Sequence, residues 1–355
     1  MLHSGSFSPG EGPRLLYFFR GETSLTRPSF AAPLEAQGWE IDCVAVSDHA
    51  PARGIPNILR CRRDLSNYEI VVASEYFLTW ALCLRLLFSR AKAKAVALTF
   101  NQSSRRLVRT GFRPFDALLN RVWRRISLFL VHSRAEARLF AKVHDIPADR
   151  FVFSYWGFDL PDFSSAKVEV PDEPYVTMIG RNNRDLATLY AAAERSGVPA
   201  IVITAGYMAN WYPAKPPANV TLLVDKPMEE CLSYVDRSFA HLVLVADSKR
   251  GAGHISAVSA MLLGKPQIFS DVAPIADYLI DDFNGIAVPL GDVDAIANAI
   301  CRLKDDSALA ERLGSAGRKF ALEHMSDHAS TSRTVDTLVA AAAGKRPEFS
   351  LEDRG

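Results

Sequence analysis

Residues 14–46 read RLLYFFRGETSLTRPSFAAPLEAQGWEIDCVAV, and this stretch decides the fold class. Its apolar opening, 14–19, predicts a buried strand, and the polar turn 21–24 follows directly. A helical pattern over 30–36 ends at a glycine, and 39–46 predicts a second strand. This order of strand, loop, helix and strand is the opening unit of a doubly wound parallel sheet.

The same alternation continues along the chain. In the first half, further apolar runs predict a helix at 77–88 and strands at 70–73, 95–100 and 128–131. A proline-containing polar stretch, 161–174, has the composition of a linker. The second half repeats the plan, with a helix at 186–196 that stops at Gly197. Its predicted strands lie at 175–179, 200–204, 220–223, 242–246 and 266–270.

We therefore expect an α/β protein of two Rossmann-like, doubly wound parallel-sheet domains that face a cleft at the carboxyl ends of their strands. The expected organisation, in chain order, is a tail at 1–13, a first domain at 14–160, a linker at 161–174, a second domain with closing helices at 175–343 and a tail at 344–355.

Composition supports two ordinary globular cores, since 48% of the 355 residues are apolar and 23% are charged. Five scattered cysteines without zinc-ligand spacing indicate idle thiols in a reducing compartment. The polar start of the chain lacks the pattern of a signal peptide. The longest apolar run, 77–88, contains Arg85 and is too short to span a bilayer. These features predict a cytoplasmic protein.

Charge is unevenly distributed. Residues 1–160 contain 22 Lys/Arg and 14 Asp/Glu, whereas 161–355 contain 19 and 26. Seven arginines with interleaved aromatic residues lie between Arg105 and Arg125. Such a segment suits an anionic membrane surface, which would make the protein peripheral on the inner membrane face. A solvated basic helix with its apolar side in the core explains the pattern equally well. Nucleic-acid binding is not expected, because the rest of the chain lacks a basic stripe or a known module.

Several segments together resemble the GT-B glycosyltransferases, especially the large retaining family that builds bacterial polysaccharides. Their order and spacing between Val131 and Met325 carry the resemblance. The matching segments are VHSRAEARLF at 131–140, DIP at 145–147, YWGFD at 155–159, IGR at 179–181, AMLLGKP at 260–266, NG at 284–285 and PLGD at 289–292.

One departure from this family concerns the mechanism. The family usually has two glutamates eight positions apart before its Gly-x-Pro run, and those places are Gly251 and Ser259 here. The local sequence is similar to a divergent GT-B branch with an Ala-Gly-His turn. The resemblance therefore leaves retention or inversion of the sugar undecided.

A nucleotide-sugar donor needs cations or amide dipoles around its diphosphate, because the leaving group gains negative charge. Gly251 and Gly253 precede a helical run at 255–263, where small residues and a helix N-terminus suit phosphate. The expected donor-binding residues, from this pattern and the resemblance, are Gly180, Arg181, Arg184, Gly251, Gly253, His254, Ser256 and Asp277. An ordinary glycine-containing loop is the alternative.

The acceptor side needs a group that takes a proton. The turn Arg20-Gly21-Glu22-Thr23 is similar to the Arg-Gly-Asp-Thr turn of inverting GT-B enzymes, which makes Glu22 the leading base candidate. Asp48, His49 and Glu75 are rival candidates. Two further side chains, Asn101 after a strand and Tyr207 in the loop 206–217, are expected to contact sugar or base.

The resemblance implies transfer of a sugar from a nucleoside-diphosphate donor, UDP before GDP, to a hydroxyl acceptor. The acceptor would be a sugar or a lipid-linked glycan in polysaccharide or glycoconjugate biosynthesis. No cofactor is expected, and no Asp-x-Asp pair lies in a suitable place for a metal site, which predicts metal independence. The alternatives are a sugar-nucleotide epimerase of the same fold and a catalytically degenerate binding protein.

Overall fold

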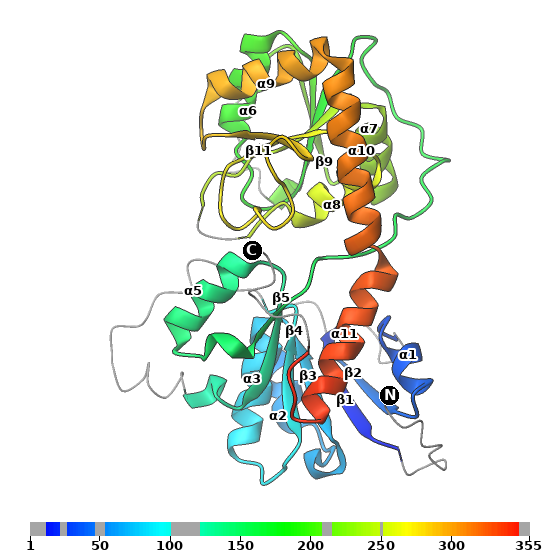
Figure 1. The fold of residues 1–355 in the computed structure, drawn as a ribbon, viewed down its shortest axis with the longest axis vertical. Coiled ribbons are helices and arrows are strands. Elements are labelled where there is room, and N and C mark those ends of the chain that lie inside the picture. Colours follow the sequence, from blue (N-terminus) through cyan, green and yellow to red (C-terminus); the bar gives the residue numbers. More distant parts are fainter. Residues whose placement is uncertain are drawn as a thin grey trace. The chain divides into compact units, whose positions relative to one another are not determined.

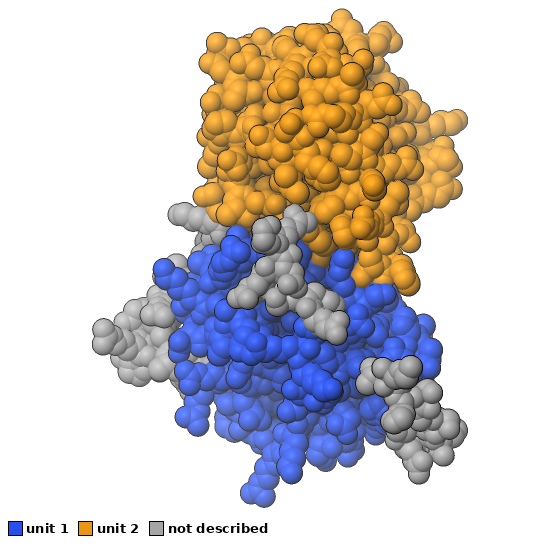
Figure 2. Space-filling view, viewed as in Figure 1, with its two compact units in different colours: residues 1–154, 330–355 blue, residues 155–329 orange. Residues whose placement is uncertain are grey.

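The computed structural model describes residues 12–21, 27–46, 54–100, 121–207, 215–248 and 251–347. The chain divides into two compact units, drawn in different colours in Figure 2. Unit 1 consists of residues 1–154 and 330–355, and unit 2 of residues 155–329. Figure 1 shows that each unit has a sheet with helices packed against it.

Unit 1 has a six-stranded parallel sheet in the order β2-β1-β3-β4-β5-β6. Its strands are β1 (Arg14–Arg20), β2 (Glu40–Val46), β3 (Ile70–Ser74), β4 (Lys94–Leu98), β5 (Ile126–Val131) and β6 (Phe151–Phe153). Its helices include α1 (Ala31–Glu35), α2 (Gly54–Arg60), α3 (Tyr76–Leu87) and α5 (Arg134–His144).

The core of unit 1 follows from apolar strands buried on both faces of the sheet. All five residues of β3 are buried, as expected for a central parallel strand. Helix α5 begins at Ser133, whose side chain accepts a hydrogen bond from the Glu136 amide. Trp123 is fully buried against Phe100. Trp123 therefore belongs to the core, as expected if the basic run forms a solvated helix whose apolar side packs in the core.

The C-terminal helix α11 (Asp327–Ala342) differs from the expected domain organisation. The sequence placed the closing helices in the second domain, but residues from 330 onward belong to unit 1. The apolar side of α11, with Val335, Leu338 and Ala341, packs in a cluster with strands of unit 1. An amphipathic pattern predicts such a helix but does not indicate which sheet it covers.

Unit 2 repeats the architecture with the strand order β12-β11-β10-β7-β8-β9, all parallel. Its strands are β7 (Val176–Ile179), β8 (Ala200–Thr204), β9 (Val220–Val224), β10 (Ala240–Val243), β11 (Gln267–Ser270) and β12 (Gly285–Val288). Its helices are α6 (Leu186–Ser196), α7 (Met228–Arg237), α8 (His254–Leu262), α9 (Val293–Asp305) and α10 (Ser307–His324).

Helix α6 shows how closely local chemistry fixes an element. Asp185 caps its start, because its carboxylate accepts hydrogen bonds from the Thr188 amide and hydroxyl. Gly197 ends it in the left-handed conformation, with φ of 67°. The fold class predicted from the sequence is confirmed, since both units are parallel α/β sheets. In the described residues, no helix is long and apolar enough to cross a membrane.

Candidate active site

The donor-side candidates gather at the carboxyl ends of β7 and β10 in unit 2, the edge where open α/β sheets bind ligands. The loop after β7 pairs with the segment after β10. The Ala246 amide donates to the Asn183 carbonyl at 3.2 Å, and the Asp185 amide donates to the Leu244 carbonyl at 3.2 Å. The Asn183 side chain adds a bond to the Asp247 carbonyl.

Asn183 was not among the residues expected to form the site. Its φ of 52° is left-handed, a conformation that asparagine tolerates better than most residues. The Asn-Asn pair at 182–183 is the sequence signal that could have indicated this turn.

Arg184 joins the β7 loop to helix α8. Its guanidinium donates to the Ile179 and Asn182 carbonyls and, through Nη2, to the Ser256 hydroxyl at 3.0 Å. The Ser256 hydroxyl in turn donates to the Gly253 carbonyl at 3.0 Å. Arg184 thus places a positive charge beside the first turn of α8, whose amide groups already carry partial positive charge.

Two glycines make room for this guanidinium. A Cβ on Gly180 would lie 2.2 Å from Arg184 Nη2, and the φ of Gly180 is +147°. A Cβ on Gly253 would lie 2.5 Å from a Val243 methyl group and 3.7 Å from Arg184 Nη1. At Gly180 and Gly253, the lack of a side chain therefore permits a close approach of backbone and cation.

His254 is the first residue of α8, and its ring faces the interior. Its Nε2 lies 2.9 Å from the Pro274 carbonyl oxygen, and the ring centroid is 4.6 Å from that of Tyr278. Burial lowers the pKa of His254 to about 4, so the ring is neutral near pH 7. His254 does not cap the helix with its side chain. It anchors the turn 272–278 beneath the helix.

The remaining donor-side candidates lie on the same edge of unit 2. Arg181 is exposed in the β7 loop, and the described part of the chain offers it no hydrogen bond or ion pair. Asp277 is half-buried in the turn below α8, and its charge acts on the His254 ring. Tyr207 follows β8 and is 66% exposed. Gly251 precedes α8 by three residues.

Several expected site residues lie outside the described residues. They are the base candidates Glu22, Asp48 and His49, the sugar-contact candidate Asn101, and positions 105–120 of the basic run. Glu75 and Arg121–Arg125 are described. Within the described ranges, no three His, Cys, Asp or Glu side chains are grouped so that they could hold a metal ion.

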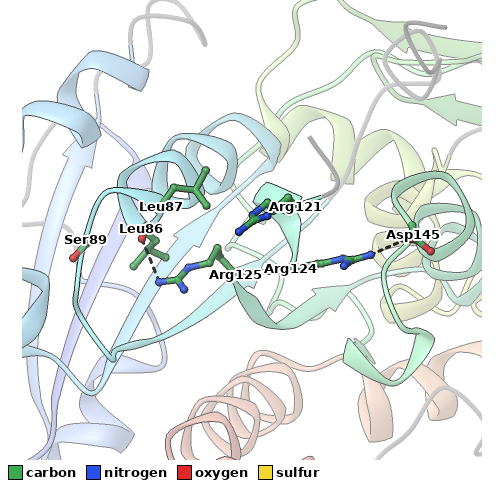
Figure 3. A pocket seen from close by; sticks show the side chains of 7 residues that line it. All are labelled: Leu86, Leu87, Ser89, Arg121, Arg124, Arg125 and Asp145. Atoms are coloured by element: carbon green, nitrogen blue, oxygen red, sulfur yellow. Dashed lines mark hydrogen bonds and ion pairs between the residues drawn. The ribbon is translucent and has the colours of Figure 1, made fainter. Parts of the chain in front are cut away.

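The described part of the basic run lines a hollow of about 670 Å³ on unit 1. Figure 3 shows the guanidinium groups of Arg121, Arg124 and Arg125 around it, with Leu86, Leu87, Ser89 and Asp145. Arg124 forms an ion pair with Asp145 at 2.9 Å, and Arg125 donates to the Leu86 carbonyl. For Arg121, the described residues provide no such partner.

This basic surface lies at the amino ends of the strands in unit 1. Arg125 immediately precedes β5, Lys94 begins β4, and Arg150 precedes β6. A second hollow shares Arg124 and is lined also by Lys94, Arg150, Lys345 and Arg346. Phe88 lies in sequence between Leu87 and Ser89, which line the first hollow, and its side chain is 90% exposed. Cations and an exposed aromatic residue thus lie at the amino ends of the strands, whereas open α/β sheets bind their ligands at the carboxyl ends.

Comparisons with known proteins concern the second unit and the fold as a whole. Residues 171–320, most of unit 2, match the model of the family described as glycosyl transferases group 1. No curated protein matches the sequence at a significant level.

Solved structures match over nearly the whole chain. Sucrose-phosphate synthase from Thermosynechococcus elongatus has a TM-score of 0.69 at 17% identity, and the match covers 94% of this chain and 100% of that chain. Anabaena HepE in complex with UDP-glucose has a TM-score of 0.67 at 14% identity, covering 92% and 99%. An α,α-trehalose-phosphate synthase (UDP-forming) from Burkholderia vietnamiensis has a TM-score of 0.63 at 14% identity, covering 94% and 98%.

By its fold the chain has the GT-B architecture, with two parallel-sheet α/β domains. Within that fold, residues 171–320 are similar to the glycosyl transferases group 1 family. The resemblance inferred from the segments between Val131 and Met325 is therefore confirmed.

Proposed function

We propose that this protein is a glycosyltransferase that takes a sugar from a nucleoside-diphosphate donor, with UDP as the favoured nucleotide, and transfers it to a hydroxyl acceptor. The observation that carries the proposal is the Arg184 cradle, defined as Gly180, Arg184, Gly253 and Ser256. It combines a fixed cation, two close-approach glycines and the start of a nine-residue helix at one strand edge. These groups suit a diphosphate.

The choice of UDP rests on related proteins. HepE has been solved with UDP, with UDP and glucose, and with UDP-glucose, and the trehalose-phosphate synthase is described as UDP-forming. Arg181 is the exposed cation nearest in sequence to the cradle and would contact the diphosphate from the β7 loop. Tyr207, at the end of β8, offers a ring for stacking on the base.

A thermal-shift panel of UDP, GDP, ADP, TDP and CDP tests the donor. A nucleotide at a hundred times its dissociation constant stabilises a protein by about 2.7 kcal/mol. We expect UDP to raise the melting temperature of the wild type but not of Arg181→Ala. A panel without any shift would contradict donor binding and favour a degenerate domain. A shift with GDP alone would make GDP the donor nucleotide and would leave the proposed glycosyl transfer unchanged.

We also propose that the reaction needs no divalent metal, since the cradle supplies the positive charge that a metal would otherwise provide. Turnover should survive dialysis against EDTA. Loss of turnover in EDTA, with recovery on addition of Mg²⁺, would contradict this.

We further propose that the basic surface of unit 1 binds an anionic bilayer, with Phe88 inserting at the interface. The exposed cations around it are Arg90, Lys92, Lys94, Arg121, Arg124 and Arg125. Each cation near an anionic membrane contributes about 1 kcal/mol, and an exposed aromatic side chain adds apolar burial. Membrane contact would bring the protein to a lipid-linked acceptor.

A further inference from the structure

Two adjacent strands of the unit 1 sheet, β1 and β3, end at a pair of opposite charges. The chain runs from β1 to β2 on one side and returns to β3 on the other side of β1. The carboxyl ends of β1 and β3 are therefore the topological switch point, where open α/β sheets bind ligands. Arg20 ends β1 and Glu75 follows β3, and Arg20 Nη2 lies 2.6 Å from Glu75 Oε2.

Strand register brings the two side chains together. The last paired residues of β1 and β3 are Phe18 and Ala73, and each charged residue lies two positions further along the chain. The side chains are 27% and 36% exposed, so solvent reaches the ion pair. Below it, the Tyr17 hydroxyl shares a hydrogen bond with the Ser74 side chain.

The backbone of Glu75 is held in a conformation that normally requires glycine. Its φ is 64° and its ψ is 163°, a region that side chains rarely occupy. Three hydrogen bonds fix it there. The Glu75 amide donates to the Leu98 carbonyl, and the Glu75 carbonyl accepts from the Thr79 amide and hydroxyl. The backbone strain thus lies at the residue whose carboxylate pairs with Arg20.

We propose that Glu75, held by Arg20, binds a hydroxyl of the acceptor, and that the acceptor is a neutral sugar. This inference rests on the glycosyl transfer proposed above. A sugar hydroxyl both donates and accepts hydrogen bonds, and the ion pair presents a carboxylate acceptor beside guanidinium donors. The pair has no net charge, which matches a neutral saccharide better than a sugar phosphate. Glu75 is thus an acceptor-binding residue and Arg20 its positioning residue.

The test measures UDP release from UDP-glucose with and without a panel of soluble saccharides, namely glucose, maltose, galactose and glucose 6-phosphate. In the wild type, a neutral saccharide should stimulate release more than glucose 6-phosphate. In Glu75→Gln, the ratio of stimulated to unstimulated release should fall at least ten-fold through a higher saccharide KM, while the thermal shift with UDP persists.

Two further variants separate acceptor binding from folding. Glu75→Gly relaxes the backbone, so it should melt no lower than the wild type and still lose the stimulation. Glu40→Gln removes a carboxylate that pairs with Arg14 at the opposite end of β1, and it should keep the stimulation.

The outcomes separate this inference from the proposed function. Full stimulation in Glu75→Gln, or a wild type stimulated only by glucose 6-phosphate or by no saccharide of the panel, would overturn the inference about Glu75. A wild type that neither binds UDP nor releases it from UDP-glucose would instead overturn the proposed function.

Discussion

Arg184 donates a hydrogen bond from Nη2 to the hydroxyl of Ser256, 3.0 Å away, and so joins the loop after β7 to the first turn of α8. The two residues are 72 positions apart in sequence. Because the same guanidinium also bonds to the Ile179 carbonyl, one side chain fixes the edge of the sheet to the helix that the proposed diphosphate would face.

Arg184→Met should lower both stability and nucleotide binding. It removes the donors of the buried Ile179 carbonyl, which costs about 1–3 kcal/mol, and it removes the charge beside α8. Urea unfolding and the UDP thermal shift measure the two effects. Arg181→Ala is the matched control, since this exposed side chain should affect only the thermal shift. Unchanged stability in Arg184→Met would contradict the role of Arg184 as a link.

Gly253→Ala should destabilise unit 2 more than Gly197→Ala does. Both glycines have positive φ, 96° and 67°, so alanine costs about 1–2 kcal/mol at either position. A Cβ on Gly253 would lie 2.5 Å from a Val243 methyl group, whereas a Cβ on Gly197 would have no atom within 4 Å. This overpacking adds about 1–3 kcal/mol to the cost at Gly253. Equal losses of unfolding free energy would show that α8 can shift away from Val243.

The fold was largely predictable because strong local signals mark its elements. Helix α6 and strand β8 have the expected bounds. An aspartate cap and a glycine stop flank α6, and a continuous apolar run forms β8. Strands β6 and β12 were not predicted. β6 has three residues and β12 begins with glycine, so neither has an alternating pattern long enough to recognise.

The candidate site was predictable in its composition but not in its contacts. The sequence indicated the two glycines, Arg184 and Ser256 of the cradle. It could not reveal that Arg184 packs on Gly180 and Gly253, because this depends on how two distant loops meet. The burial of the His254 ring and the positive φ of Glu75 also had no sequence signal, since both are imposed by neighbouring elements.

Stability should fall as the pH drops below neutrality. Burial lowers the pKa of His254 to about 4 and that of His241 to about 3, whereas an unfolded histidine titrates near 6.5. Between these values the unfolded chain binds more protons than the native protein. Stability is therefore complete above about pH 6.5 and is lost as the pH falls toward 4, by at most about 1.4 kcal/mol per pH unit for each histidine.

Urea unfolding at pH 7.5 and pH 5.5 measures this dependence. His254→Phe should reduce the loss between the two values, because one buried neutral ring no longer gains a proton on unfolding. A loss as large as that of the wild type would contradict a depressed pKa at His254.

Charge reversal on the basic surface should abolish vesicle binding. We expect the wild type to sediment with vesicles that contain phosphatidylglycerol and not with pure phosphatidylcholine. Arg121→Glu, Arg124→Glu and Arg125→Glu together should prevent this, and Phe88→Ser should weaken it. The matched control reverses three exposed cations of unit 2, Arg302, Lys304 and Arg318. Equal sedimentation of the two triple variants would contradict a membrane role for the basic surface.

The central claim is that the Arg184 cradle binds the diphosphate of a UDP donor, and hydrogen exchange with and without UDP tests it most directly. We predict that UDP slows amide exchange in residues 179–186 and 251–263 of the wild type, and that Arg184→Met abolishes this protection. Protection confined to other segments, or no protection at saturating UDP, would contradict the assignment of the donor site.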